Sequence, residues 1–231
     1  DRLRSRGLGD VYKRQSFNLM DLAHVKSYDE LLDLTAKTPY HDILKKYKPE
    51  LADGHIDYAA CELSLRTYYS GRLVASLHKF GGETEKRLKS YLGTQIDTIN
   101  IANAYRMIHF FNADQQTVKS RMIPVYLKIP ERKMDELYSA QNDQEFLKTL
   151  AAGYYGREMA EQGIDMAEPD TALARLRFKQ TKRAFSSARS APECFFTFNS
   201  LAEVEVKNII RIIEGIRYDL PAKEISELLI T

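Results

Sequence analysis

One helical plan occurs twice in this sequence, and the repetition constrains the fold more than any other feature. Ile96–Pro124 and Ala202–Thr231 both read as acid-x-x-Asn, a long apolar helix, a short break and a second, short helix. The acids and amides of the two copies are 108 residues apart: Asp97 and Glu205, Asn100 and Asn208. Repetition of a helical unit multiplies surface and not catalytic centres, so the pattern indicates a scaffold.

A second pair of segments extends the duplication. Ser27–Leu44 matches Asn142–Met159 at an offset of 115, and both begin with a capping residue followed three positions later by Glu. In such a cap, the capping side chain and the Glu carboxylate each accept a free backbone amide of the first turn. Chance similarity between two amphipathic helices is the alternative, because caps of this kind are common. We expect Glu30 and Glu145 to lie at the start of equivalent helices.

The basic charge of the chain lies in its first fifteen residues. The formal net charge is +2, and residues 1–15 carry five basic and two acidic side chains. The remainder is therefore close to neutral and gives no global signal for nucleic acid. Residues 1–15 also lack apolar periodicity and the apolar region of a signal peptide. We expect them to be a non-native or disordered leader.

The sequence contains no recognisable catalytic or metal-binding motif. Cys61 and Cys194 have no CxxC spacing, and the five histidines form no HxxH or HExxH pair. Gly81-Gly82 lacks the residues of a phosphate-binding loop. No apolar run approaches the ~18 residues of a membrane span. We expect a soluble or membrane-peripheral protein with no metal, no cofactor and no small-molecule substrate.

The hydrophobic period is helical almost throughout, so we expect an all-α fold of tandem related lobes. The one β-like stretch, Ile123–Ile129, contains Pro124 and precedes Pro130, and we expect an extended connector there. Breaks are expected at Gly81-Gly82 and Ala191-Pro192. The expected lobes are residues 16–130 and 131–231. The expected helices cover residues 28–37, 39–46, 60–79, 84–91, 95–111, 114–122, 131–140, 143–152, 154–163, 169–188, 198–218 and 221–229.

Both long repeated helices carry an apolar stripe at helical spacing. The two sets of residues are again 108 positions apart: Ile101, Ala104, Tyr105 and Ile108 in the first copy, and Ile209, Ile212, Ile213 and Ile216 in the second. Such a stripe normally faces a core. We therefore expect Ile213→Asp to destabilise the second copy severely, by burying an unpaired charge.

Seven polar residues form the candidate interface: Asp97, Asn100, Glu205, Asn208, Arg211, Glu214 and Arg217. Each acid and its Asn share a helix face, where they could bind a hard cation, act as an acid/base pair, cap a helix or line a polar interface. A catalytic pair is not normally built twice in one chain, which favours an interface or inter-helix role. The charges of Arg211, Glu214 and Arg217 alternate in sign along the helix. This pattern fits either an exposed ion-pair ladder or a recognition face for another subunit.

Thr171–Ser190 contains six basic residues and no acidic ones, with Phe178 and Phe185 on one helical face. This is the best candidate in the chain for contact with nucleic acid or lipid headgroups. A solvated basic helix that packs its aromatic side chains inward is the simpler interpretation. No RNA-binding signature accompanies the segment.

Three segments resemble a known family: TPYHDIL at Thr38–Leu44, YLGTQIDTINIANAYR at Tyr91–Arg106 and EVEVKNIIRIIEGIRYDLPAKEISELLI at Glu203–Ile230. They are similar to the C subunit of the bacterial and archaeal V/A-type rotary ATPases, the counterpart of the d subunit in the eukaryotic vacuolar enzyme. The resemblance covers most of residues 27–231 and is nearest to clostridial-type bacterial members.

The resemblance implies a non-catalytic subunit that couples ATP-driven rotation to ion transport. Members of the family are all-helical, with three related lobes around a funnel that seats the central stalk on the cytoplasmic face of the proteolipid ring. The implied partners are therefore the central-stalk subunits and the ring, with no cofactor and no nucleic acid. The two copies found here correspond to the second and third lobes, so we expect a truncated chain. The alternatives are a stand-alone α-helical repeat adaptor and a basic nucleic-acid-binding protein that uses Thr171–Ser190.

Overall fold

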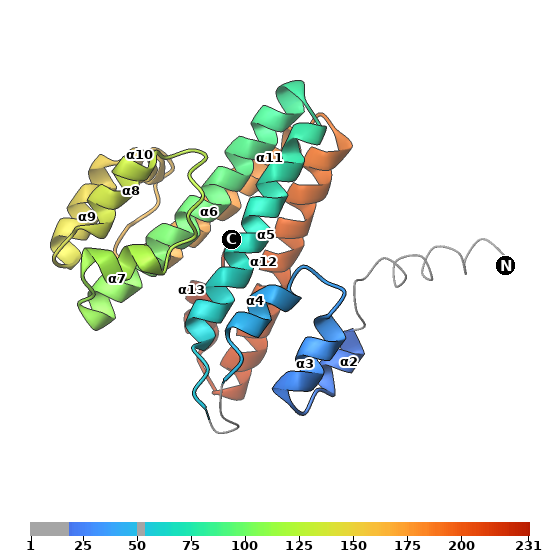
Figure 1. Cartoon of the computed structure of the whole chain (residues 1–231). Helices are drawn as coiled ribbons and strands as arrows, with labels where there is room; N and C mark the ends of the chain where they lie inside the picture. Colours follow the sequence, from blue (N-terminus) through green and yellow to red (C-terminus); the bar gives the residue numbers. More distant parts are fainter. Residues whose placement is uncertain (1–18, 50–53) are drawn as a thin grey trace. The chain divides into compact units, whose positions relative to one another are not determined.

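The computed structural model describes residues 19–49 and 54–231, and every regular element in these residues is a helix (Figure 1). The expected all-α fold is confirmed. The chain forms two compact units, one ending at Tyr69 and the other formed by Ser70–Thr231. The boundary between them falls inside α5 (Tyr58–Ser76). The expected leader at residues 1–15 lies outside the described residues, and the lobe boundaries at residues 130 and 131 stay a prediction.

The first unit contains three short helices before α5: α2 (Leu19–Ala23), α3 (Tyr28–Thr35) and α4 (His41–Lys46). The cap expected at the start of α3 is present. The Ser27 hydroxyl accepts the Glu30 amide at 3.2 Å, and the Glu30 carboxylate accepts the Lys26 amide at 2.8 Å. The Tyr28 hydroxyl donates to the Leu44 carbonyl at 2.7 Å and thereby ties α3 to α4.

The second unit is built on three long helices that lie side by side, α6, α11 and α12, with short helices gathered against the C-terminal half of α6 (Figure 1). Its elements are η1 (Leu77–Lys79), α6 (Gly82–Phe111), α7 (Gln115–Ser120), α8 (Glu131–Tyr138), α9 (Asp143–Ala152), α10 (Tyr154–Glu161), α11 (Pro169–Ser186), α12 (Ala191–Arg217) and α13 (Ala222–Leu228). The cap expected for α9 is also present: the Asn142 side chain accepts the Glu145 amide at 3.0 Å.

Two apolar clusters hold this unit together. The larger one joins the C-terminal half of α6 to α7–α11 through side chains such as Ile101, Phe146 and Tyr155. The smaller one packs η1 against the N-terminal half of α6 through Leu77 and Leu88. Each large apolar side chain buried in this way contributes about 1.5–3 kcal/mol to the free energy of unfolding, before conformational entropy is subtracted.

Two expected helix boundaries are wrong. The helices expected at 84–91 and 95–111 are one continuous helix, α6, although Gly93 lies in its middle. The last long helix begins at Ala191 and not at 198, because Pro192 lies in the first turn, where a missing amide costs nothing. The other expected helices are confirmed to within a few residues at their ends.

The two apolar stripes have opposite environments. Ile101, Ala104 and Ile108 are at most 2% exposed, as expected. Their equivalents on α12 are not buried: Ile213 is 59% exposed and Ile216 is 64% exposed. The expectation that the second stripe faces a core is therefore wrong for this structure. The buried positions of α12, such as Thr197 and Gly215, lie on the opposite side of the helix, so the stripe points away from the unit.

Candidate functional site

Two asparagines one repeat apart make the same pair of contacts. The Asn100 amide donates to the Ile123 carbonyl at 2.9 Å, and its oxygen accepts the Ile123 amide at 3.0 Å. The Asn208 amide donates to the Ile230 carbonyl at 2.8 Å, and its oxygen accepts the Ile230 amide at 3.0 Å. In both copies a side chain of the long helix therefore pairs with the backbone of the segment that follows the short helix. The repeat seen in the sequence is also a repeat of geometry.

The turns after the two long helices also correspond. Asn112 follows α6 with φ of 46°, and Asp219 follows α12 with φ of 54°. Asn and Asp are the residues other than glycine that most readily adopt this left-handed conformation. Each turn leads into a short helix, α7 or α13, so the chain reverses in the same way in both copies.

Asp97 is fully buried at the centre of the second unit. One carboxylate oxygen accepts the Ile129 amide at 3.1 Å and the Tyr155 hydroxyl at 3.0 Å. The other oxygen is buried and has no hydrogen-bond partner among the described residues. Burial raises the pKa of Asp97 to about 6, and the opposing effects of Tyr155, Ile129 and Lys128 only reduce the rise. The side chain thus joins α6, the connector and α10.

Three residues on one face of α6 hold the extended connector, Ile123–Pro130, and we call Gly93, Asp97 and Asn100 the connector seat. Asp97 and Asn100 bind connector backbone at its two ends, as described above. Between them the connector approaches so closely that a Cβ on Gly93 would lie 3.0 Å from the Cβ atoms of Leu127 and Lys128. The seat therefore explains why a glycine, which weakens a helix interior, lies in the middle of α6.

The remaining candidate residues lie on α12. The Glu205 and Glu214 side chains are exposed, and their carboxylates make no hydrogen bond or ion pair with the described residues. Arg211 donates to the Asn208 side-chain oxygen at 3.1 Å, and the Arg217 guanidinium lies 5.7 Å from the centre of the neighbouring Tyr218 ring. In the described chain no ion-pair ladder joins these residues, and their interface role stays a prediction.

Several cations of the basic segment are engaged within the fold. Arg175 donates to the Glu227 carbonyl at 3.2 Å, and Lys179 donates to the Gln162 carbonyl at 3.1 Å. The Lys182 ammonium lies 5.2 Å from the centre of the Phe178 ring. These contacts place part of the charge of α11 in the packing of the unit. Phe185 is 40% exposed, so the two aromatic side chains do not both pack inward as the simpler interpretation of this segment expects.

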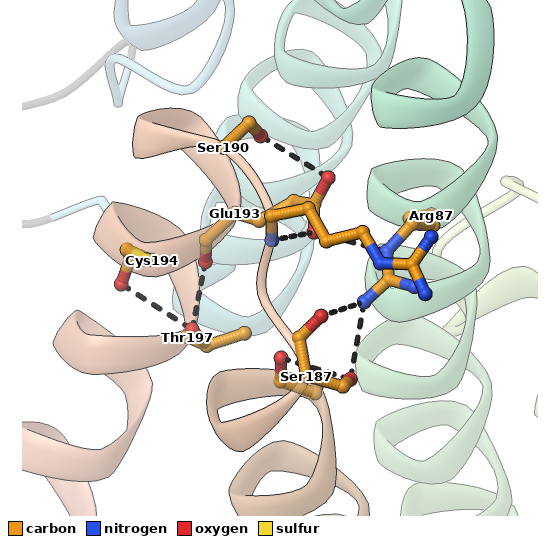
Figure 2. Close-up of polar contacts among 8 residues, drawn as sticks. Arg87, Ser187, Ser190, Glu193, Cys194 and Thr197 are labelled. Carbon is orange, nitrogen blue, oxygen red and sulfur yellow. Dashed lines mark hydrogen bonds and ion pairs between the residues drawn. The ribbon is translucent and has the colours of Figure 1, made fainter.

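A polar cluster that is not among the candidate residues joins α6 to the turn between α11 and α12 and to the start of α12. Figure 2 shows Arg87 of α6 reaching toward Ser187 and Glu193. The Arg87 guanidinium donates to the Glu193 carboxylate at 2.9 Å and to the Ser187 carbonyl at 2.6 Å. Glu193 also accepts the Arg189 amide at 3.0 Å and the Ser190 hydroxyl at 3.1 Å. The cluster locks the start of α12 against α6.

The pKa of Glu193 lies below its usual value. Burial alone would raise the pKa, but the Arg189 amide, the Ser190 hydroxyl and Arg87 stabilise the charged form more strongly. The sequence held a signal for part of this cluster, because Ser190-x-x-Glu193 has the spacing of a reciprocal cap. The pairing with Arg87 could not be inferred, since that residue is about a hundred positions away.

The described residues hold no group of three or more side chains suited to a metal ion, and none of their helices is long and apolar enough to cross a membrane. Asp97 and both asparagines are occupied by backbone groups and a tyrosine hydroxyl. The arrangement fixes the path of the chain, and the acid-x-x-Asn pairs act structurally where they are buried.

Comparison with known proteins identifies the family. Residues 11–228 match the family model of the ATP synthase (C/AC39) subunit. The chain is 24% identical over 219 residues to the C subunit of the A-type ATP synthase from Methanosphaera stadtmanae. That match covers 90% of the chain and 56% of the relative, so the chain spans little more than half of the relative's length. No solved structure matches the chain. Because the family match extends over nearly all of the sequence, the chain belongs to the ATP synthase C/AC39 subunit family.

Proposed function

We propose that this chain is part of a non-catalytic coupling subunit of a V/A-type rotary ATPase. In this proposal it lies at the cytoplasmic face of the membrane and transmits torque between the central stalk and the proteolipid ring during ion transport. Membership of the C/AC39 family and the name of the archaeal relative support an assignment to a rotary ATP synthase.

The observation that carries the proposal is the exposed apolar face of α12. We call it the α12 stripe, and it consists of Phe195, Phe198, Ala202, Val206, Ile209, Ile213 and Ile216. Its phenylalanine, valine and isoleucine side chains are each at least 50% exposed. Contiguous apolar surface of this kind marks an interaction site or an aggregation liability. A subunit that works only inside an assembly has a use for such a face, because stable assembly interfaces are apolar at their centre.

The internal packing also suits a part that transmits force. The connector is held to α6 by buried hydrogen bonds at both ends, through Asn100 and Asp97. The start of α12 is held to α6 by the Arg87–Glu193 pair. Buried hydrogen bonds at these points favour one rigid arrangement over many, and a coupling part must resist deformation under load.

Co-purification tests the proposal. A tagged form of the full-length protein, expressed in its own host, should bring down the central-stalk subunits and the proteolipid ring in constant proportion. Full-length protein that associates with neither would overturn the proposal. The adaptor and nucleic-acid alternatives are not proposed, because no contact of the described residues favours either.

A further inference from the structure

A groove of about 710 Å³ opens in the second unit between the connector, α8, α9 and α10. Its floor is apolar and comes from all four segments: Ile129, Leu137, Leu150 and Tyr155 line it. Each of these side chains is at most 9% exposed. The groove is therefore a depression with an apolar floor and room for inserted side chains of a partner.

Cations surround this floor. Lys128, Lys133, Lys148 and Arg157 line the groove, together with the acids Glu136 and Glu145. Both acids are already engaged: Glu136 pairs with Lys133 at 2.7 Å, and Glu145 accepts the Gln141 amide at 2.9 Å. The groove thus has a net positive rim.

Two rim cations are free to meet a ligand. Lys148 of α9 and Arg157 of α10 are both exposed, and neither makes an ion pair with any described residue. A third cation, Lys128, is fixed in position: its ammonium donates to the Thr94 hydroxyl at 2.9 Å and lies 4.9 Å from the centre of the Tyr154 ring. Positive charge therefore faces the groove from the connector and from two helices.

Buried hydrogen bonds and close backbone packing beneath the floor fix the positions of its residues. Asp97 accepts the amide of Ile129 and the hydroxyl of Tyr155, the two floor residues that come from the connector and α10. Gly156, the next residue of α10, packs so tightly that a Cβ there would lie 2.2 Å from the Leu150 carbonyl oxygen. A preformed surface loses little entropy when a ligand binds, so this groove is suited to recognition.

We propose that the groove binds an acidic segment of another subunit of the same complex. An apolar side chain of that segment occupies the floor, and flanking Asp or Glu carboxylates pair with Lys148 and Arg157. The assignment rests on the proposed function, since the partner is a subunit of the rotary ATPase. A membrane surface fits less well, because a planar bilayer cannot reach apolar residues that lie between helices.

A binding titration with a defined probe tests the groove directly. The probe is a short fluorescent helical peptide with leucine and glutamate on one face, titrated with the purified full-length protein. Lys148→Glu combined with Arg157→Glu should weaken binding about tenfold or more, equivalent to about 1.4 kcal/mol. Replacing the peptide glutamates with glutamine should weaken binding to the wild-type protein similarly. Arg132→Glu, which changes an exposed cation of α8 outside the groove, is the matched control and should bind normally.

Three results would overturn the groove assignment. The first is equal binding of the glutamate and glutamine peptides to the wild-type protein. The second is unchanged peptide binding by the double variant. The third is binding of anionic phosphatidylglycerol vesicles that depends on Lys148 and Arg157, in the absence of peptide binding, because the charges would then face a membrane.

Photo-crosslinking inside the purified complex separates this assignment from the proposed function. A crosslinker placed at position 152, which lines the groove and leaves both cations in place, should react with a segment of another subunit that carries Asp or Glu, and crosslinks confined to the same chain would contradict the groove. If the Lys148→Glu/Arg157→Glu variant co-purifies normally with the other subunits and no crosslink to another subunit forms, the groove assignment is rejected and the proposed function is not. Failure of the wild-type protein to co-purify with stalk or ring rejects the proposed function as well.

Discussion

At the scale of single residues, the buried polar groups of the second unit act by fixing the chain. The sequence identified Asp97 and Asn100 because they recur in the second copy. It could not identify their partners, Ile123, Ile129 and Tyr155, which lie 23 to 58 residues away and meet them only after folding. Side-chain spacing along one helix shows which groups share a face, and the tertiary fold decides what that face meets.

Asp97 gives the protein a specific dependence of stability on pH. Because its folded-state pKa is raised from 3.8 to about 6, the stability it contributes is fully present below about pH 3.8 and is lost as the pH rises through about 6. The difference corresponds to roughly 3 kcal/mol. Asp97→Asn should therefore flatten the change in unfolding free energy between about pH 4 and about pH 6.5, measured by urea denaturation. Glu205→Gln, at the equivalent exposed position, should keep the wild-type slope. An unchanged slope in Asp97→Asn would refute this role.

The two equivalent asparagines should differ in their contribution to stability. Asn100→Ala removes a partner from both the buried amide and the carbonyl of Ile123. The amide is left unpaired, at about 1–3 kcal/mol, while the carbonyl keeps the Val125 amide at 2.8 Å. Asn208→Ala exposes the same two groups of Ile230, but Asn208 is only half-buried, so water can replace part of its contacts. The loss of unfolding free energy in urea should be clearly larger for Asn100→Ala. Equal losses would contradict the difference in burial.

At the scale of helices, the hydrophobic period located almost every element, and the errors arose at particular residues. The interruption expected between residues 91 and 95 contains Gly93, and the close approach of the connector compensates for the cost of a glycine inside the helix. The sequence indicates a break at Ala191-Pro192, whereas Pro192 lies in the first turn of α12. Local propensity is a weak guide wherever tertiary contact or position in the first turn changes its effect.

The packing of α9 against α10 depends on a missing side chain. A Cβ at position 156 would lie 2.2 Å from the Leu150 carbonyl oxygen and 2.5 Å from the Ala151 Cα, both backbone atoms that cannot move away freely. Gly156→Ala should lower the free energy of unfolding by about 1–3 kcal/mol or more. Gly71→Ala, in the interior of α5 with open space around it, should be neutral or stabilising by up to about 1 kcal/mol. Thermal unfolding of the two variants compares them, and a stable Gly156→Ala variant would show that the helices are not in tight contact.

At the scale of the whole molecule, the sequence predicted the all-α class and the repeated unit, and it was wrong about the surroundings of α12. Periodicity shows that one face of a helix is apolar, but it does not show what covers that face. In the first copy α8 and α9 pack against α6, and in the second copy the equivalent stripe is exposed. The proposed function assigns this exposed face to contact with other subunits.

The most direct test of that assignment is the amount of central-stalk and ring protein that co-purifies with Ile213→Asp in the full-length subunit. Ile213 is 59% exposed, so its substitution should change the free energy of unfolding by no more than about 0.5 kcal/mol. It should nevertheless abolish or sharply reduce recovery of the other subunits. Lys207→Asp, which places the same charge on another side of α12, should leave recovery unchanged. Full recovery of stalk and ring by a folded Ile213→Asp variant would contradict the account.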